Sequence, residues 1–133
     1  MPTREDMIAT IDRAFAARAA GDVEVMNAIW AEGATYAMEG AEELMTRYPT
    51  GPGDAHAAIE RLADLLEAAD IRRVDTIVEG HRAAVLWRAN FSNGRDAPRT
   101  LQLFSRWEFD DAGRVTAMHE YADTATIAAL IAG

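Results

Sequence analysis

Cysteine is absent from the 133 residues of this chain. Disulfide bonds, thiolate metal sites and cysteine nucleophiles are therefore excluded, and a reducing cytoplasm is a compatible setting. No apolar run approaches the roughly 18–20 residues that a membrane-spanning helix needs. The first residues include acidic side chains and lack an apolar core, so we expect no signal peptide and a cytoplasmic location.

Positive charge is scarce: 13 lysines and arginines face 22 aspartates and glutamates, for a formal net charge of −9. A field of that sign repels phosphate backbones and anionic lipid. We therefore expect neither a nucleic-acid partner nor a membrane partner. Half of the residues are apolar, which is enough to form the core of one domain over residues 1–133.

Motifs for cofactors and metals are also missing. The sequence contains no phosphate-binding loop and no dinucleotide fingerprint. The spacing of His56 and His81 matches no metal-ligand motif. We expect no cofactor and no metal ion.

The N-terminal part shows helical patterns. Thr3 and Asp6 form a capping box before an apolar stripe, and Gly21 is placed to end that helix. Asp22 can cap a second, shorter helix, which we expect to end at Gly33.

A short extended segment at 34–38 and a loop rich in glycine and proline at 39–53 come next. Loops of this length in a compact domain are often lids. Asp54 can then cap a third helix with an apolar stripe.

The second half reads as strands. Apolar and polar residues alternate over 72–78 and roughly on both sides of a tight turn at 110–113, and residues 81–92 form a longer, more buried run. Asp123 can cap a final short helix. We predict an α+β fold in which three helices and a short strand precede a four-strand antiparallel meander.

Three segments together resemble the superfamily of nuclear transport factor two, ketosteroid isomerase, limonene epoxide hydrolase and the SnoaL-like polyketide cyclases. They are residues 15–36 (FAARAAGDVEVMNAIWAEGATY), 53–66 and 104–123. The resemblance implies a cone-shaped, curved antiparallel sheet wrapped around N-terminal helices, a cystatin-like α+β barrel with a deep apolar pocket. It also implies a homodimer through the outer face of the sheet.

The ketosteroid isomerase pattern requires a tyrosine on the first helix, a carboxylate on the first strand and a carboxylic acid on the penultimate strand. Ala14, Met38 and Ser105 occupy those positions here. Phe15 is adjacent to the first of them, and we expect it to point elsewhere. The resemblance therefore argues against that activity.

The limonene epoxide hydrolase pattern is met only in part. Tyr36 matches its tyrosine, and Glu120 stands where that enzyme has an aspartate on the last strand. Met38, Ala89 and Phe91 replace its remaining groups, so its water-activating network is incomplete.

Strand parity places one set of side chains on the inner face of the sheet. With residues from the helices, the expected pocket consists of Trp30, Tyr36, Met38, Leu62, Leu66, Trp87, Phe91, Leu103, Ser105, Trp107, Met118 and Glu120. Tyr48, in the loop, is a candidate to close over a ligand.

Glu120 is the only carboxylate in this expected pocket. Burial disfavours a charged carboxylate and raises its pKa, which turns a glutamate into an acid or base near neutral pH. Our hypothesis is that Glu120 is the catalytic or ligand-anchoring group, with Tyr36 or Ser105 as its hydrogen-bond partner. The alternative is that Glu120 pairs with Arg106 or Arg114 on a solvated face.

The opposite face of the last strand carries His119, Tyr121 and Asp123. A histidine and a carboxylate on one face could perform acid–base chemistry. A polar dimer interface is the competing interpretation, since Asp123 has an obvious role as a helix cap.

These patterns predict a SnoaL-like protein that binds a small hydrophobic molecule. As an enzyme it would be a cofactor-independent isomerase, cyclase or hydratase-like lyase with Glu120 as acid or base. The alternative is a non-catalytic ligand-binding module or a dimeric interaction module, which the missing catalytic groups favour.

Overall fold

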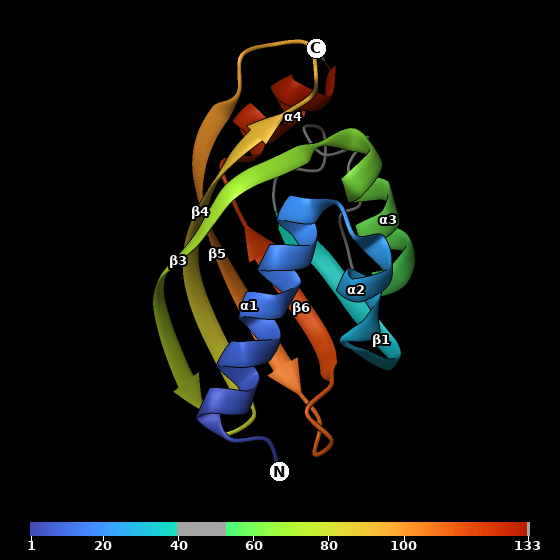
Figure 1. Ribbon diagram of the computed structural model, residues 1–133, viewed down its shortest axis with the longest axis vertical. Coiled ribbons are helices and arrows are strands. Elements are labelled where there is room, and N and C mark those ends of the chain that lie inside the picture. Colours follow the sequence, from blue (N-terminus) through green and yellow to red (C-terminus); the bar gives the residue numbers. More distant parts are fainter. Residues whose placement is uncertain (40–52, 133) are drawn as a thin grey trace.

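The computed structural model describes residues 1–39 and 53–132, apart from the side chains at 54, 58, 59 and 62 (Figure 1). Its helices are α1 (Arg4–Ala20), α2 (Val23–Ala28), α3 (Ala55–Leu65) and α4 (Thr124–Ala132). Its strands are β1 (Trp30–Glu39), β2 (Gly53–Asp54), β3 (Glu67–Glu79), β4 (Arg82–Ser92), β5 (Arg99–Phe109) and β6 (Val115–Tyr121).

Helix α1 is bounded as its sequence predicts. The Thr3 side chain accepts a hydrogen bond from the Asp6 backbone N–H at 3.1 Å, and the Asp6 carboxylate accepts one from the Thr3 N–H at 2.9 Å. Gly21 ends the helix with φ at 70°, a left-handed conformation that glycine adopts without steric cost. Both predicted boundaries are confirmed.

The end predicted for the second helix is wrong. The helix is capped by Asp22, whose side chain accepts from the Val25 N–H as predicted, but it ends at Ala28 rather than at Gly33. Trp30 continues the apolar spacing of the helix, yet it already belongs to β1 and pairs with Val115 of β6. Pairing with a distant strand therefore overrides the local helical pattern.

The sheet has the strand order β2-β1-β6-β5-β4-β3, and its curved form stays open (Figure 1). Strands β3 to β6 form the predicted antiparallel meander. Strand β1 adds to it beside β6 in parallel, which no local pattern indicated. The α+β fold class is confirmed.

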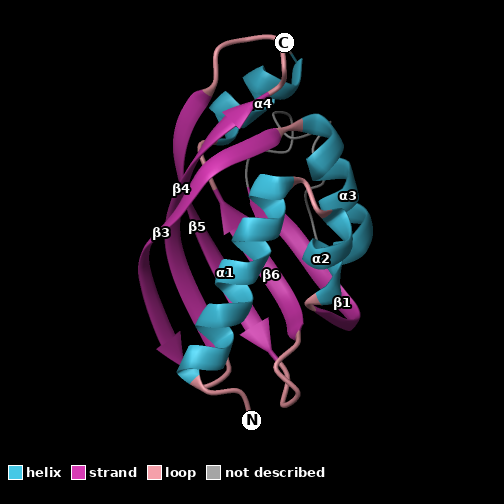
Figure 2. Cartoon of the chain, viewed as in Figure 1, coloured by secondary structure: helices cyan, strands magenta, loops and turns pink. Residues whose placement is uncertain are grey.

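Helices α1, α2 and α3 cover the concave face of this sheet (Figure 2). Helix α1 turns Ile11 and Phe15 toward the sheet, and both are buried. Helix α4 is capped by Asp123, which accepts from the Thr126 N–H at 3.2 Å as predicted. Among the described residues, no helix is long and apolar enough to cross a membrane.

Candidate functional site

A row of side chains crosses the inner face of the sheet at its centre. Ser105 on β5 lies opposite Glu120 on β6, and Met38 on β1 lies opposite Glu120 from the other side. Strand alternation turns all three toward the helices, and all three are buried. The carboxyl group of Glu120 therefore lies in the interior of the protein.

Glu120 is only 6% exposed, and its carboxyl group has one hydrogen-bond partner among the described residues. The Tyr36 hydroxyl donates to Glu120 Oε1 at 3.1 Å, while Oε2 has no partner among the described residues. Burial raises the pKa of Glu120 to about 7, against smaller lowering effects of the Tyr36 hydrogen bond and the positive charge of Arg18. The alternative of a solvated pair with an arginine is therefore wrong.

Ser105 is not the partner of Glu120, although the two residues face each other across the strands. The Ser105 hydroxyl oxygen accepts a hydrogen bond from Trp107 Nε1 at 2.8 Å. Of the two partners proposed from sequence, the structure places Tyr36 on the carboxyl group.

A cavity of about 50 Å³ lies beside Glu120, between α1, α2 and the sheet. Five residues predicted for the pocket line it: Trp30, Trp87, Trp107, Met118 and Glu120. Apart from Glu120 and Arg18, its walls are formed by apolar and aromatic side chains.

Sequence reasoning missed the helical part of this lining, which comprises Ala14, Phe15, Arg18, Met26 and Ile29. The expectation that Phe15 points elsewhere is wrong, because its ring packs on Trp87 with the centroids 4.7 Å apart. Helical spacing was the signal that could have found them: Ala14 and Arg18 are four positions apart, and Met26 and Ile29 are three apart.

Arg18 lines both this cavity and a groove of about 380 Å³. Its Nη2 donates a hydrogen bond to the backbone carbonyl of Leu66 at 2.7 Å, which links the end of α1 to the start of β3. Leu66 was predicted for the pocket, but it lines the outer groove instead. Arg18 is thus shared by the linings of the two spaces.

The remaining predicted pocket residues lie elsewhere. Five of them are buried in the core and are not part of the cavity lining: Tyr36, Met38, Phe91, Leu103 and Ser105. Tyr48 and the side chain of Leu62 lie outside the described residues.

The outer face of the sheet carries the polar set that strand parity placed there. Phe104 and Tyr121 are 44% and 46% exposed, with ring centroids 6.5 Å apart. His119 Nδ1 lies 3.4 Å from Glu39 Oε1 rather than against Asp123, whose hydrogen bonds with Thr126 lower its pKa. The proposed acid–base pairing of His119 with Asp123 is therefore not formed.

Metal ligands do not gather anywhere in the part of the chain that the structure describes, since no three His, Asp or Glu side chains form a suitable group. The chemistry that this site supports comes from Glu120, held by Tyr36 and facing an apolar space.

Solved structures with the same fold share little sequence with this chain. An NTF2-like protein of unknown function from Burkholderia pseudomallei is 20% identical, with a TM-score of 0.77 over 96% of this chain and 98% of that one. A proposed polyketide cyclase from Xanthomonas campestris pv. campestris is 17% identical, with a TM-score of 0.74 and the same coverage. An LEH-like epoxide hydrolase from M. tuberculosis is 14% identical, with a TM-score of 0.72 over 97% and 92%.

These likenesses establish the fold alone. No curated protein matches the chain. The model of the SnoaL-like domain family matches residues 11–118, which include the second half of α1, the lining of the cavity apart from Glu120, and most of the sheet. The chain therefore belongs to the SnoaL-like domain family.

Proposed function

We propose that the chain binds a small, largely hydrophobic molecule beside Glu120 and moves a proton on it, as a cofactor-independent isomerase or cyclase. The observation that carries this proposal is the burial of Glu120 in an apolar cavity, which raises its pKa to about 7. Both protonation states of such a carboxyl group are populated at neutral pH, as an acid–base catalyst requires.

The two oxygens of Glu120 are suited to different tasks. Oε1 accepts from the Tyr36 hydroxyl, which fixes the orientation of the carboxyl group. Oε2 is buried and has no hydrogen-bond partner among the described residues, so no other bond competes for it when a ligand reaches the carboxyl group. Tyr36 is therefore a positioning residue, and Glu120 is the candidate catalytic residue.

The size of the cavity limits the ligand. About 50 Å³ holds a few water molecules or a fragment of a few heavy atoms, and it is well below the ~300–1,000 Å³ typical of ligand pockets. The groove of about 380 Å³ lies directly beyond Arg18. A larger ligand could extend from the cavity into the groove if the Arg18 side chain moved away from the Leu66 carbonyl.

Two structural relatives bear the names of enzymes acting on small molecules, an epoxide hydrolase and a proposed polyketide cyclase. These names favour a reaction over binding alone. Ala14, Met38 and Ala89 replace catalytic groups of the superfamily, so acid–base chemistry here would depend on Glu120.

Proton transfer can be tested before the substrate is known. A panel of small neutral ketones in D₂O is followed by proton NMR for loss of the hydrogens next to the carbonyl. We expect the wild-type protein to accelerate exchange for at least one ketone, and Glu120→Gln to remove the acceleration. Glu108→Gln, on the outer face of β5, is the matched control and should exchange as the wild type does.

A different result would favour the non-catalytic alternative. If a ketone binds and shifts the signals of cavity residues without any exchange, the chain is a binding module. If exchange persists in Glu120→Gln, Glu120 is not the base.

We also propose a homodimer through the outer face of the sheet. The exposed, adjacent rings of Phe104 and Tyr121 support it, because a contiguous exposed apolar patch can mark a protein–protein interaction site. Phe104→Glu should convert the dimer to a monomer in sedimentation experiments, whereas Ala57→Glu on the exposed face of α3 should not. A monomeric wild-type protein would contradict the proposal.

A further inference from the structure

We propose that a groove on the outer face of the sheet is a second binding site, which holds the carboxylate group of a small organic acid between Arg72 and Arg88. The groove has a volume of about 300 Å³. It is lined by Asp70, Arg72, Arg88, Ala89, Asn90 and Thr100. Its lining shares no residue with that of the cavity beside Glu120, so this site goes beyond the proposed function and can be tested separately.

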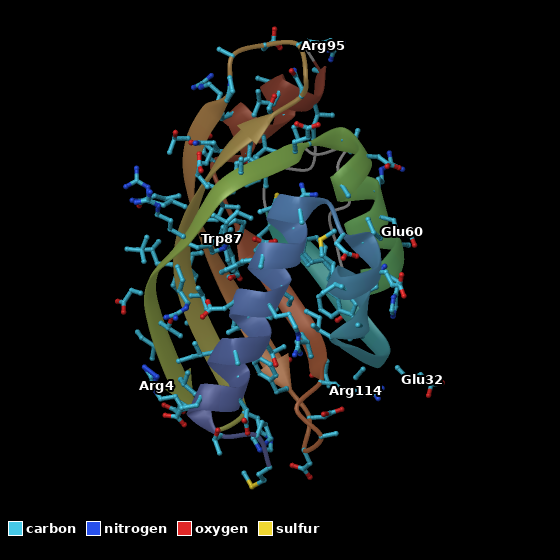
Figure 3. All side chains as sticks on the ribbon, in the orientation of Figure 1. Arg4, Glu32, Glu60, Trp87, Arg95 and Arg114 are labelled. Atoms are coloured by element: carbon cyan, nitrogen blue, oxygen red, sulfur yellow. The ribbon has the colours of Figure 1, made fainter. Side chains whose placement is uncertain are left out.

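The two arginines lie side by side on the outer face. Arg72 of β3 and Arg88 of β4 are direct partners across the two strands. Figure 3 shows Trp87, the residue before Arg88, between α1 and the sheet. Successive side chains of a strand point to opposite faces, so Arg88 and its partner Arg72 point outward, and both are exposed. The Cβ atoms of such partners are ~4.5–5.5 Å apart, a separation at which like charges repel each other.

No carboxylate among the described residues forms an ion pair with either arginine. Three other strand arginines each lie within 4.0 Å of a carboxylate: Arg73 of Asp12, Arg82 of Glu79 and Arg106 of Glu108. The chain has 22 acidic residues against 13 basic ones, yet it places Arg72 and Arg88 together without an acid between them. Conflicts of this kind with local electrostatics are expected at functional sites. An anion bound between the two guanidinium groups would remove the repulsion.

A bulge in β3 brings the two arginines together. Between Asn90 and Arg88, β4 advances by two residues, whereas the paired stretch of β3 advances by three, from Ala69 to Arg72. Without the extra residue, the residue before Arg72 would lie opposite Arg88 instead. The bulge contains Asp70, whose φ of 52° is the only positive value of a non-glycine residue in the described part of the chain. Such backbone is uncommon, and bulges often re-aim side chains beside functional sites.

Hydrogen bonds order the groove wall next to the arginines. Thr100 Oγ1 donates to Asn90 Oδ1 at 2.5 Å, and Asn90 Nδ2 donates to Asp70 Oδ2 at 2.9 Å. These bonds hold the Asp70 carboxylate in the lining, where it offsets one of the two positive charges. A monoanion therefore balances the charge of the groove, whereas a doubly charged phosphate would leave excess negative charge near Asp70.

The shape of the donors favours the same ligand. A guanidinium group is a planar fork that can donate to both oxygens of a carboxylate. The volume of about 300 Å³ is at the lower end of the ~300–1,000 Å³ typical of ligand pockets, so it suits a small molecule. The groove is therefore assigned to a small monocarboxylic acid in its ionised form.

The test compares benzoate with benzamide, which has the same shape without the charge, at constant ionic strength. We expect benzoate to shift the ¹⁵N–¹H signals of the Arg72 and Arg88 Nε–H groups saturably, and benzamide to leave them in place. Arg88→Met should weaken benzoate binding by about tenfold or more, as for a charge-assisted hydrogen bond. Arg82→Met, at an arginine of the same strand that is paired with Glu79, is the matched control and should change binding less than twofold.

A loss of binding through misfolding is distinguished by stability. Without ligand, Arg88→Met should be at least as stable as the wild type, because the repulsion is gone, and benzoate should raise the unfolding temperature of the wild type alone. Equal shifts with benzoate and benzamide, or full benzoate binding by Arg88→Met, would overturn the site. Tighter binding of inorganic phosphate than of benzoate would overturn the assignment to a carboxylate.

Two further outcomes also count against the site. If the methyl signal of Met118 in the cavity moves with benzoate while the arginine signals stay in place, benzoate binds beside Glu120 and not in the groove. If the Arg72 and Arg88 signals shift when the protein alone is concentrated, the carboxylate belongs to a second copy of the chain and the small-molecule site is overturned. The proposed function stands or falls on ketone exchange, which none of these outcomes decides.

Discussion

The Tyr36 hydroxyl donates a hydrogen bond to the buried carboxyl group of Glu120 at 3.1 Å, although the two residues are 84 positions apart in the chain. They are diagonal neighbours on the parallel strands β1 and β6, where Tyr36 lies opposite Met118 and Met38 lies opposite Glu120. The hydrogen bond lowers the pKa of the Glu120 carboxyl group, whereas burial raises it. The two effects can therefore be tested by mutation.

Replacing Tyr36 with phenylalanine should raise the pKa of Glu120 above its value of about 7, because the hydrogen bond that favours the ionised form is lost. The measurement is a carboxyl ¹³C titration in which Glu120→Gln identifies the signal. Tyr121→Phe, at an exposed tyrosine, is the control and should leave the titration unchanged. An unchanged or lower pKa in Tyr36→Phe would mean that the bond does not stabilise the carboxylate.

Replacing Arg18 with methionine should also raise the pKa of Glu120, because the positive charge of Arg18 lowers it. The same titration measures the effect. In the wild-type protein, the lowering of the Glu120 pKa by Arg18 should become smaller at high salt, since salt screens charges. Arg13→Met removes an exposed arginine from the same helix and is the matched control. Equal titrations of the two variants would show that Arg18 does not act on Glu120.

The contribution of Glu120 to the stability of the fold should fall as pH rises toward neutrality. The folded state keeps the Glu120 proton up to about pH 7, whereas the unfolded chain releases it near 4.5, so the folded state binds more protons in between. The unfolding free energy contributed by this group therefore decreases over that window, by roughly 3 kcal/mol when complete.

The side chain introduced by Glu120→Gln cannot ionise, so the unfolding free energy of this variant should lack this decrease. The unfolding free energy of the variant should therefore rise relative to that of the wild type between pH 5 and pH 8. Urea unfolding at both pH values measures the difference, and Glu108→Gln should follow the wild type. Parallel pH dependences of wild type and Glu120→Gln would contradict the burial of a titrating carboxyl group.

Replacing Thr3 with alanine should destabilise the protein by about 0.5–2 kcal/mol, because the side chain satisfies the Asp6 N–H at the start of α1. Thermal or urea unfolding measures the loss. Thr116→Ala is the comparison variant, because it removes a β6 hydroxyl that donates to a backbone carbonyl outside any helix cap. A Thr3→Ala protein as stable as the wild type would mean that the capping box contributes nothing.

Local chemistry in the sequence was sufficient for the helix starts and for the strand faces. The caps at Thr3, Asp22 and Asp123 depend on side chains that reach only two or three residues along the chain. The face that Glu120 takes on β6 follows from the alternation of a single strand. Such features can be predicted from the sequence because the residues that form them are close together in the chain.

The tertiary structure alone decided what touches Glu120 and how much space lies beside it. The parallel pairing of β1 with β6 brings Tyr36 to the carboxyl group, and it also converts Trp30 from a helical to a strand residue. Phe15 and Arg18 reach the cavity only because α1 crosses the sheet at this point. These contacts join segments far apart in the chain, so they follow from packing of the whole fold and not from any local period.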